Sequence, residues 1–478
     1  MKNLLSYYNN LSEPIKATLW FTISSIIQKG IALLSTPIFT RLLTTEEYGV
    51  YSVYQSWYSI LLIFATLNLY AGVYNNGMTK WPDKRQEYTS SLLGLSTCIT
   101  LIWFIIYLVN RQFWNDLLGL SSIFMSAMFI QVLVEPAYSF WSASERFDYR
   151  YKKLVLISLI IGMISPILGV VAVVSTEYKA EARVLSYVLV QVLIGLVFYI
   201  YNMYKGKRFY IKKYWKFALS FNIPLIPHYL SQTILNQADR IMIASMVGKS
   251  EAAIYSVAYT ISMMFTIVTN AINNSFIPYT YKSIRDKEYH QLKSSASFLV
   301  ILVGTFCIIA MAFGPEIIRI FAASEYYEAR WMIPPVSESL FFMFIYPLFC
   351  NIEFYYEQTK FIMLASGIAA IANIGMNYIV INQFGYISAA YTTLICYILL
   401  AVVHYFAYKI ICKKNTINFE MYDINLIIRF SIISISIMVF MTLIYDYILI
   451  RYTIIIIILY IILKKRKLVK KKLMEIRN

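Results

Sequence analysis

Ionisable side chains inside long apolar segments are the residues of this sequence best placed to do chemistry. Lys29 lies about 12 residues into the apolar segment 17–40, roughly 18 Å along a helix that rises ~1.5 Å per residue. Arg240 lies in the segment 217–247, and Arg41 closes the first segment. A cation at membrane depth is costly and usually faces a partner or a wet cavity. We therefore predict that Lys29, Arg41 and Arg240 contact a phosphate or acidic group. The alternative is a structural ion pair for Lys29 and Arg240, and a position that simply marks the membrane interface for Arg41.

Two carboxylates lie in similar surroundings. Asp239 precedes Arg240 in a segment that Pro224 and Pro227 should kink, because proline removes a backbone donor. Broken helices at membrane depth typically line cavities. We expect Asp239 either to hold Arg240 in place or to bind a proton or cation. Glu135 is a second candidate for ion coupling.

Asparagines recur at corresponding places in two apolar segments. They lie near the ends of segments 48–72 and 252–276 and are Asn68, Asn75, Asn76, Asn270, Asn273 and Asn274. Amides and tyrosines are suitable contacts for sugar hydroxyls, so we predict Asn75, Asn270 and Asn274 as substrate contacts. Hydrogen bonding between helices is the alternative for each of them.

Motifs that serve catalysis or cofactor binding are absent from the sequence. It contains no phosphate-binding GxxxxGK[ST] loop, no HExxH, no nucleophile elbow and no glycine-rich dinucleotide loop. Its 5 cysteines and 3 histidines occur singly, without metal-ligand spacing. We therefore expect no metal, no cofactor and no enzymatic activity, which leaves translocation as the main class of function.

Fourteen apolar segments of membrane-spanning length must position these residues. A helix needs roughly 20 apolar residues to cross the hydrocarbon core, and the 59% hydrophobic and 14% charged content excludes an ordinary soluble domain. The segments are 17–40, 48–72, 89–109, 117–141, 154–174, 184–203, 217–247, 252–276, 294–313, 332–350, 361–381, 388–408, 425–444 and 446–463. The predicted fold class is an all-α polytopic membrane protein with about fourteen transmembrane helices.

The basic residues are distributed unequally between the two sides of these segments. With the N-terminus on the cytoplasmic side, 31 of the 42 Lys and Arg residues fall in cytoplasmic segments and 8 in the opposite loops. This is the positive-inside pattern, so both termini are predicted to be cytoplasmic. The net charge of +17 therefore indicates contact with anionic headgroups of the lipid bilayer and no nucleic-acid partner.

A short internal repeat indicates two related halves. Residues 46–54 (EEYGVYSVY) match residues 250–258 (SEAAIYSVA) at four of nine positions, and both copies follow a long segment and open the next. Six segments separate the copies, which predicts parallel repeats related by an axis along the membrane normal. The predicted division, in order along the chain, is an N-lobe (1–204), a cytoplasmic linker (205–216), a C-lobe (217–408) and a region holding the last two helices and a basic tail (409–478).

Several short motifs give the chain a resemblance to a known family. They are TRLL at 40–43 with EYGVY at 47–51, DRIMI at 239–243 with IYSVAY at 254–259, and IPYTYK at 277–282. Together with the layout of segments, they resemble bacterial polysaccharide-unit flippases of the Wzx type. These belong to the multidrug/oligosaccharidyl-lipid/polysaccharide flippase superfamily, with the drug/cation antiporters and lipid II flippases.

The resemblance implies a substrate and a location. It implies that an O-antigen or capsule repeat unit, an oligosaccharide joined through pyrophosphate to a polyprenol, is flipped across the bacterial cytoplasmic (inner) membrane by alternating access of two lobes. A polysaccharide polymerase and a chain-length regulator become candidate partners. A cation-coupled drug antiporter of the same superfamily and a membrane glycan polymerase remain alternatives, although the longest outer loop is short for a polymerase.

Overall fold

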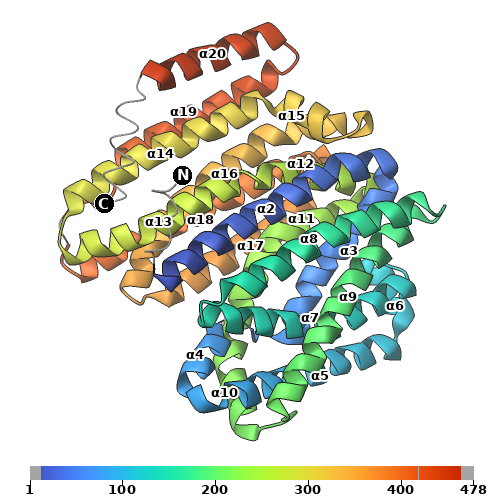
Figure 1. Cartoon of the computed structure of the whole chain (residues 1–478). Helices are drawn as coiled ribbons and strands as arrows, with labels where there is room; N and C mark the ends of the chain where they lie inside the picture. The colour runs from blue at the N-terminus through green and yellow to red at the C-terminus, as the bar shows by residue number, and fades with distance from the viewer. Residues whose placement is uncertain (1–11, 71, 418, 465–478) are drawn as a thin grey trace, which may run out of the picture. The chain divides into compact units, whose positions relative to one another are not determined.

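The computed structural model describes residues 12–464 except 71 and 418, and all regular structure in these residues is helical (Figure 1). The chain forms two compact units, Met1–Ser245 and Met246–Asn478. The first contains α2 (Glu13–Leu42), α3 (Thr45–Thr66), α4 (Gly72–Lys80), α5 (Arg85–Val109), α6 (Arg111–Leu118), α7 (Ser122–Phe147), α8 (Tyr151–Val174), α9 (Lys179–Gly206), α10 (Lys212–Asn222) and nearly all of α11 (Ile226–Met246). The second contains α12 (Lys249–Met263), α13 (Thr266–Arg285), α14 (Tyr289–Ala312), α15 (Gly314–Phe321), α16 (Ile333–Tyr355), α17 (Thr359–Phe384), α18 (Ser388–Lys414), α19 (Ile424–Leu443) and α20 (Ile448–Lys464).

The lengths and composition of these helices fit a chain that crosses the membrane many times. Within the described residues, 10 helical segments are long and apolar enough to span a bilayer, and α12 with α13 makes an eleventh if this pair is one span. Three further predicted segments are occupied by α3 and α11, which contain more polar residues, and by the shorter α20. Each predicted segment thus coincides with a helix or bent pair, and the predicted fold class is confirmed.

Helix α3 begins and ends at identifiable sequence signals. Thr44 and Glu47 form a capping box, in which the Thr44 hydroxyl accepts from the Glu47 amide at 3.2 Å and the Glu47 carboxylate accepts from the Thr44 amide at 2.8 Å. The helix ends at Thr66, earlier than predicted, because Leu67 and Asn68 adopt left-handed φ values of 48° and 52°. The chain restarts as α4, which places Asn75 on a separate short helix.

Two predicted segments are interrupted in the structure. Pro224 lies in the 3₁₀ turn Ile223–Leu225 between α10 and α11, so the interruption predicted from the prolines is confirmed. Helices α12 and α13 are bent by 41° where Met264 and Phe265 separate them. Asn270 and Asn274 therefore lie on the second half of a broken element.

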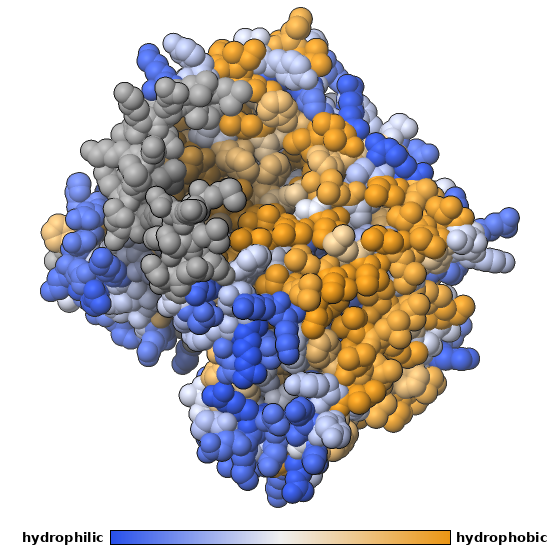
Figure 2. All heavy atoms as spheres, in the orientation of Figure 1, coloured by the Kyte–Doolittle hydropathy of each residue, from blue (hydrophilic) through white to orange (hydrophobic). Residues whose placement is uncertain are grey.

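In the first unit, α7 packs closely along α9. A Cβ atom on Gly195 of α9 would lie 2.8 Å from the backbone carbon of Val134 in α7, so only glycine permits this approach. Apolar side chains are exposed along the outer faces of α8 and α9, where Figure 2 shows a continuous hydrophobic surface; they include Leu156, Ile160, Ile164, Ile167, Val171, Leu189, Leu193, Val197 and Ile200. Lipid tails favour such a surface, because they offer no partner for polar groups.

In the second unit, α16 and α18 form the centre, and α19 and α20 lie along α14 (Figure 1). Tyr445, just after α19, donates a hydrogen bond to the Met311 carbonyl at 2.6 Å. Arg451 of α20 forms two hydrogen bonds with the Glu316 carboxylate of α15, at 2.7 and 2.8 Å. These contacts attach the last two helices firmly to the unit.

The predicted division into lobes stays a prediction. The compact units place α10 and nearly all of α11 in the first unit, whereas the sequence repeat assigns them to residues 205–216 and 217–408.

Candidate functional site

A cavity of about 520 Å³ opens in the first unit between the start of α4 and the last turns of α7. It is lined by aromatic, hydroxyl, amide and cationic side chains, namely Tyr70, Asn75, Tyr138, Ser139, Ser142, Ala143, Arg146 and Phe147. Its volume lies in the range typical of small-molecule sites, about 300–1,000 Å³. Of the predicted substrate contacts, Asn75 lines this cavity.

The early end of α3 creates this cavity. Because the chain turns at Leu67 and Asn68, Tyr70 and the following helix α4 come to lie beside α7. The Leu67 carbonyl accepts a hydrogen bond from the Asn222 side chain at 2.7 Å. The ring of Tyr70 then packs edge-on against Phe140 with centroids 6.3 Å apart.

One face of α7 supplies most of the polar lining. Tyr138, Ser142 and Arg146 follow one another at intervals of four residues, and Ser139 lies three residues before Ser142, so all four line one side of the helix. Glu135 extends the same face inward, about 16 Å from Arg146 at ~1.5 Å per residue. Such a face combines flat rings, hydroxyls and a guanidinium, which are suited to sugar rings, sugar hydroxyls and phosphate oxygens respectively.

Glu135 is half-buried and joins a hydrogen-bond network between α3 and α7 whose other members are buried. Its carboxylate accepts from the Tyr58 hydroxyl and, at 2.9 Å, from the Gln131 amide. The Gln131 oxygen in turn accepts from the Tyr54 hydroxyl at 2.9 Å, and Gln131 and Tyr54 are fully buried. No cation forms an ion pair with Glu135 among the described residues. A carboxylate held only by neutral donors can exchange a proton or cation without breaking an ion pair.

Arg240 belongs to a second polar group of the first unit, on α11. Its Nη1 donates to the Gln237 oxygen at 2.7 Å, and that oxygen also accepts from the Ser56 hydroxyl of α3 at 3.2 Å. The Arg240 side chain is half-buried, whereas Asp239 beside it is only 2% exposed. The structure thus connects Arg240 with α3, but places it apart from the lining of the α7 cavity.

Arg183 is a further cation of the first unit, which the predicted segments 154–174 and 184–203 place in an outer loop between them. Arg183 lies in the first turns of α9, is 7% exposed, and has its guanidinium 3.9 Å from the ring centroids of both Phe39 and Tyr51. Its Nε and Nη1 atoms make no hydrogen bond to the described residues. A sandwiched guanidinium of this kind is stabilised by cation–π attraction. Only the tertiary fold brings Phe39 and Tyr51 to it, so no local signal could have revealed it.

Four predicted contacts are exposed and lie outside these clusters. Lys29 is exposed on α2, and Arg41 is exposed with its Nη1 bonded to the Pro37 carbonyl at 2.8 Å. Asn270 and Asn274 are exposed on α13, while Asn273 accepts from Asn351 at 3.3 Å. Lys29 and Arg41 do not line the α7 cavity, and Asn270 and Asn274 belong to the second unit.

The second unit holds buried carboxylates whose partners the sequence did not reveal. Glu353 lies within α16, and its carboxylate is 2.7 Å from the His404 ring of α18, with both side chains at most 1% exposed. Glu338 accepts from the Ser434 hydroxyl at 2.5 Å. His404 looked isolated in the sequence because its partner lies 51 residues away.

Comparisons with known families and structures agree on one superfamily. Residues 15–283 match the model of the family described as polysaccharide biosynthesis protein, and residues 224–379 match the model described as MatE. The Lsg locus putative protein 1 of Haemophilus influenzae is 23% identical over 371 residues, which cover 75% of this chain and 89% of that protein.

Solved structures with similar folds include a flippase and a transporter. A structure described as the lipid II flippase MurJ in an inward closed conformation has a TM-score of 0.66 at 15% identity, covering 94% of this chain and 100% of that one. An outward-facing multidrug resistance MATE family transporter has a TM-score of 0.55 at 12% identity, covering 86% and 98%. At these identities the likeness shows the fold alone.

Proposed function

Because the chain belongs to the polysaccharide biosynthesis protein family, as the match over residues 15–283 shows, we propose that it flips a polyprenyl-pyrophosphate-linked oligosaccharide from the cytoplasmic to the outer leaflet. The chain is a multi-pass membrane transporter of the superfamily that includes lipid II flippases and MATE transporters, and it is not an enzyme. We infer the identity of the substrate from the side chains of the first unit.

The α7 cavity is the observation that carries this proposal. A sugar–pyrophosphate headgroup cannot cross hydrocarbon unaided, because its polar groups would lose water without replacement. Side chains of the cavity can replace this water. Tyr70 and Tyr138 can contact the faces of sugar rings, Asn75 and two serines can bond to sugar hydroxyls, and Arg146 can bind an anionic group. The apolar outer faces of α8 and α9 allow a polyprenol tail to stay in lipid meanwhile.

The remaining predicted residues take proposed roles outside this cavity. Lys29, Arg41 and Arg240 are proposed contacts for pyrophosphate or acidic sugars, and Asn270 and Asn274 for sugar hydroxyls, at other stages of transport. Glu135 and Asp239 are proposed sites of ion coupling, supported by the burial of Asp239 and by the neutral donors around Glu135.

A cation-coupled drug antiporter is the second candidate. The match of residues 224–379 to the MatE model favours it, and so does the embedded Glu135. Arg146 argues against it, because a guanidinium in the cavity repels a cationic drug and attracts an anionic headgroup.

The proposed function includes a location in the cell and two protein partners. We place the protein in the bacterial cytoplasmic membrane with both termini cytoplasmic, on the strength of the unequal distribution of Lys and Arg. A polysaccharide polymerase and a chain-length regulator are proposed partners, because a flipped repeat unit must be consumed in the outer leaflet.

The test is reconstituted flipping of a polyprenyl-pyrophosphate oligosaccharide, followed by access of an external glycosidase to the sugar. The double variant Asn75→Ala/Tyr138→Ala should slow flipping at least tenfold, since a lost hydrogen bond and a lost stacking face are each worth about 1 kcal/mol or more. The matched control is Asn76→Ala, which alters an exposed neighbour outside the lining. Transport of a cationic dye but not of the lipid-linked sugar would favour the second candidate.

A further inference from the structure

A second cavity of the first unit, about 760 Å³, shares no lining residue with the α7 cavity and lies where α5 begins and α7 and α9 end. Its lining includes six cations, Lys84, Arg85, Arg150, Lys205, Lys207 and Arg208, against four carboxylates, Asp83, Glu87, Glu145 and Asp148. The distribution of Lys and Arg predicts that this end is cytoplasmic. We propose that this pocket binds a phosphate-bearing group presented at the cytoplasmic surface of the membrane.

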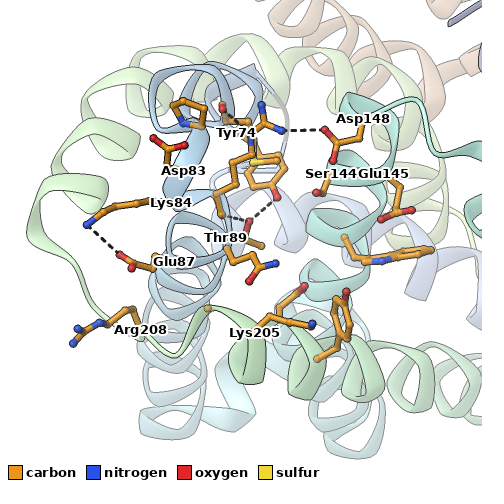
Figure 3. A pocket seen from close by; sticks show the side chains of 18 of the residues that line it. Tyr74, Asp83, Lys84, Glu87, Thr89, Ser144, Glu145, Asp148, Lys205 and Arg208 are labelled. Atoms are coloured by element: carbon orange, nitrogen blue, oxygen red, sulfur yellow. Dashed lines mark hydrogen bonds and ion pairs between the residues drawn. The ribbon is translucent and has the colours of Figure 1, made fainter. Parts of the chain in front are cut away.

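Three of the four carboxylates are already neutralised. Asp148 pairs with Arg85 at 3.0 Å and with Arg150 at 2.9 Å, and Arg150 also reaches Glu145 at 3.7 Å. Lys84 lies 4.0 Å from Glu87, as the dashed line in Figure 3 marks. These pairs bind the start of α5 to the turn after α7 and form one wall of the pocket.

The other wall carries cations without such partners. Lys205, Lys207 and Arg208 form no ion pair within the described part of the chain. Figure 3 shows Lys205 and Arg208 on the side of the pocket opposite Asp148. Unpaired cations along one wall give the pocket an excess positive potential, which favours an anion.

The basic wall is held rigidly in place. A Cβ on Gly206 would lie 2.1 Å from the Ser90 hydroxyl oxygen, so α9 ends in direct contact with α5. Ser90 also donates to the Arg208 carbonyl at 2.9 Å, and Ser91 accepts from the Ile211 amide at 3.0 Å. The backbone that bears the three cations is therefore ordered before any ligand arrives, which lowers the entropic cost of binding.

Further features of the pocket suit a phosphate. No side chain caps the start of α5, so the positive end of its dipole faces the region lined by Gln86 and Glu87. Tyr74, Thr89 and Asn202 line the interior, and Asn202 is fixed by a 2.8 Å bond to the Ala137 carbonyl. Basic pockets between transmembrane helices on the cytoplasmic side are a known form of headgroup site.

Two sources can present this chemistry, a soluble phosphate compound or a lipid headgroup, and the test separates them. The full chain is placed in phosphatidylcholine nanodiscs and titrated with inorganic pyrophosphate by calorimetry. In the second arm, nanodiscs containing phosphatidylglycerol are used, and native mass spectrometry counts the lipids that stay bound. The proposal does not depend on the proposed transport function.

The variant is Lys205→Gln/Lys207→Gln/Arg208→Gln, and the matched control is Lys409→Gln/Lys413→Gln/Lys414→Gln on the last turns of α18. All six side chains are exposed, so neither variant should change the melting temperature by more than a few degrees. The pocket variant should bind its ligand about 100-fold more weakly, as expected for three lost cations near an anionic group. The control should bind like the wild type.

Loss of pyrophosphate binding in the pocket variant alone would identify a soluble phosphate ligand. Loss of bound phosphatidylglycerol in that variant alone would identify a lipid headgroup. Equal behaviour of the pocket variant and the control in both arms would overturn the proposal. Should the triple variant fold poorly, the single variants Lys205→Gln and Arg208→Gln carry the same test, with an expected loss of about fivefold each.

Discussion

Replacing Glu135 in two ways separates its structural role from its proposed role in coupling. Glu135→Ala removes the acceptor of two donors, the Tyr58 hydroxyl and the Gln131 amide. A buried donor left without a partner costs about 1–3 kcal/mol, so this variant should lose about 2–6 kcal/mol of stability. Glu135→Gln keeps an oxygen at the same place and should lose less than about 1.5 kcal/mol.

The same pair of variants differs in transport. Glu135→Gln cannot exchange a proton or cation at this position, so flipping should no longer respond to an imposed proton or sodium gradient. Thermal unfolding in detergent gives the stability, and flipping in proteoliposomes with and without each gradient gives the coupling. If Glu135→Gln flips substrate with the gradient response of the wild type, the carboxylate has no coupling role and the network is structural only.

Three further predictions concern stability. Gly195→Ala should cost about 1–3 kcal/mol, measured by thermal unfolding, because the new Cβ meets the Val134 backbone, which cannot move aside; unchanged stability would mean that α7 and α9 are not packed this closely. Arg451→Gln should cost about 3–5 kcal/mol, because it leaves the Glu316 carboxylate without its charged partner; a melting temperature equal to that of the wild type would contradict the ion pair. Burial acts to raise the pKa of Glu316, but the hydrogen bonds from Arg451 outweigh it and hold the pKa below the ordinary value of 4.5. The stabilisation by this pair should therefore be present above pH 4.5 and disappear as the pH falls through the lowered pKa, and unfolding measured between pH 7 and pH 3 should show that loss in the wild type but not in Arg451→Gln.

Hydrophobic patterning was sufficient to predict the helices of this protein. Runs of about 20 apolar residues admit few structures other than a membrane helix, and the prolines of segment 217–247 marked its interruption correctly. The end of α3 at Thr66 was not predictable in the same way. Leu67 and Asn68 continue an apolar run, and their left-handed conformation depends on tertiary contacts such as the bond from Asn222.

The candidate site was predictable only in part, for a related reason. Asn75 and Glu135 stood out because polar residues are rare in apolar segments. Tyr70, Tyr138 and Arg146 were not identified, because aromatic residues and an arginine at the end of a segment are common near the membrane interface. They line a cavity only because α4 lies beside α7 in the folded chain. The contacts of Arg183 and the pairing of Glu353 with His404 were not predictable either, because the partners are distant in the sequence.

The most direct measurement is photo-crosslinking with a polyprenyl-pyrophosphate oligosaccharide that carries a diazirine on its first sugar. The chain in proteoliposomes is irradiated, and the labelled peptides are identified by mass spectrometry. If the α7 cavity holds the headgroup, labels should fall on the cavity-lining part of α7 (138–147) and on the start of α4, and an excess of unlabelled substrate should remove them. Labels confined to lipid-facing side chains of α8 and α9, or unaffected by competition, would contradict the assignment of this cavity to the substrate.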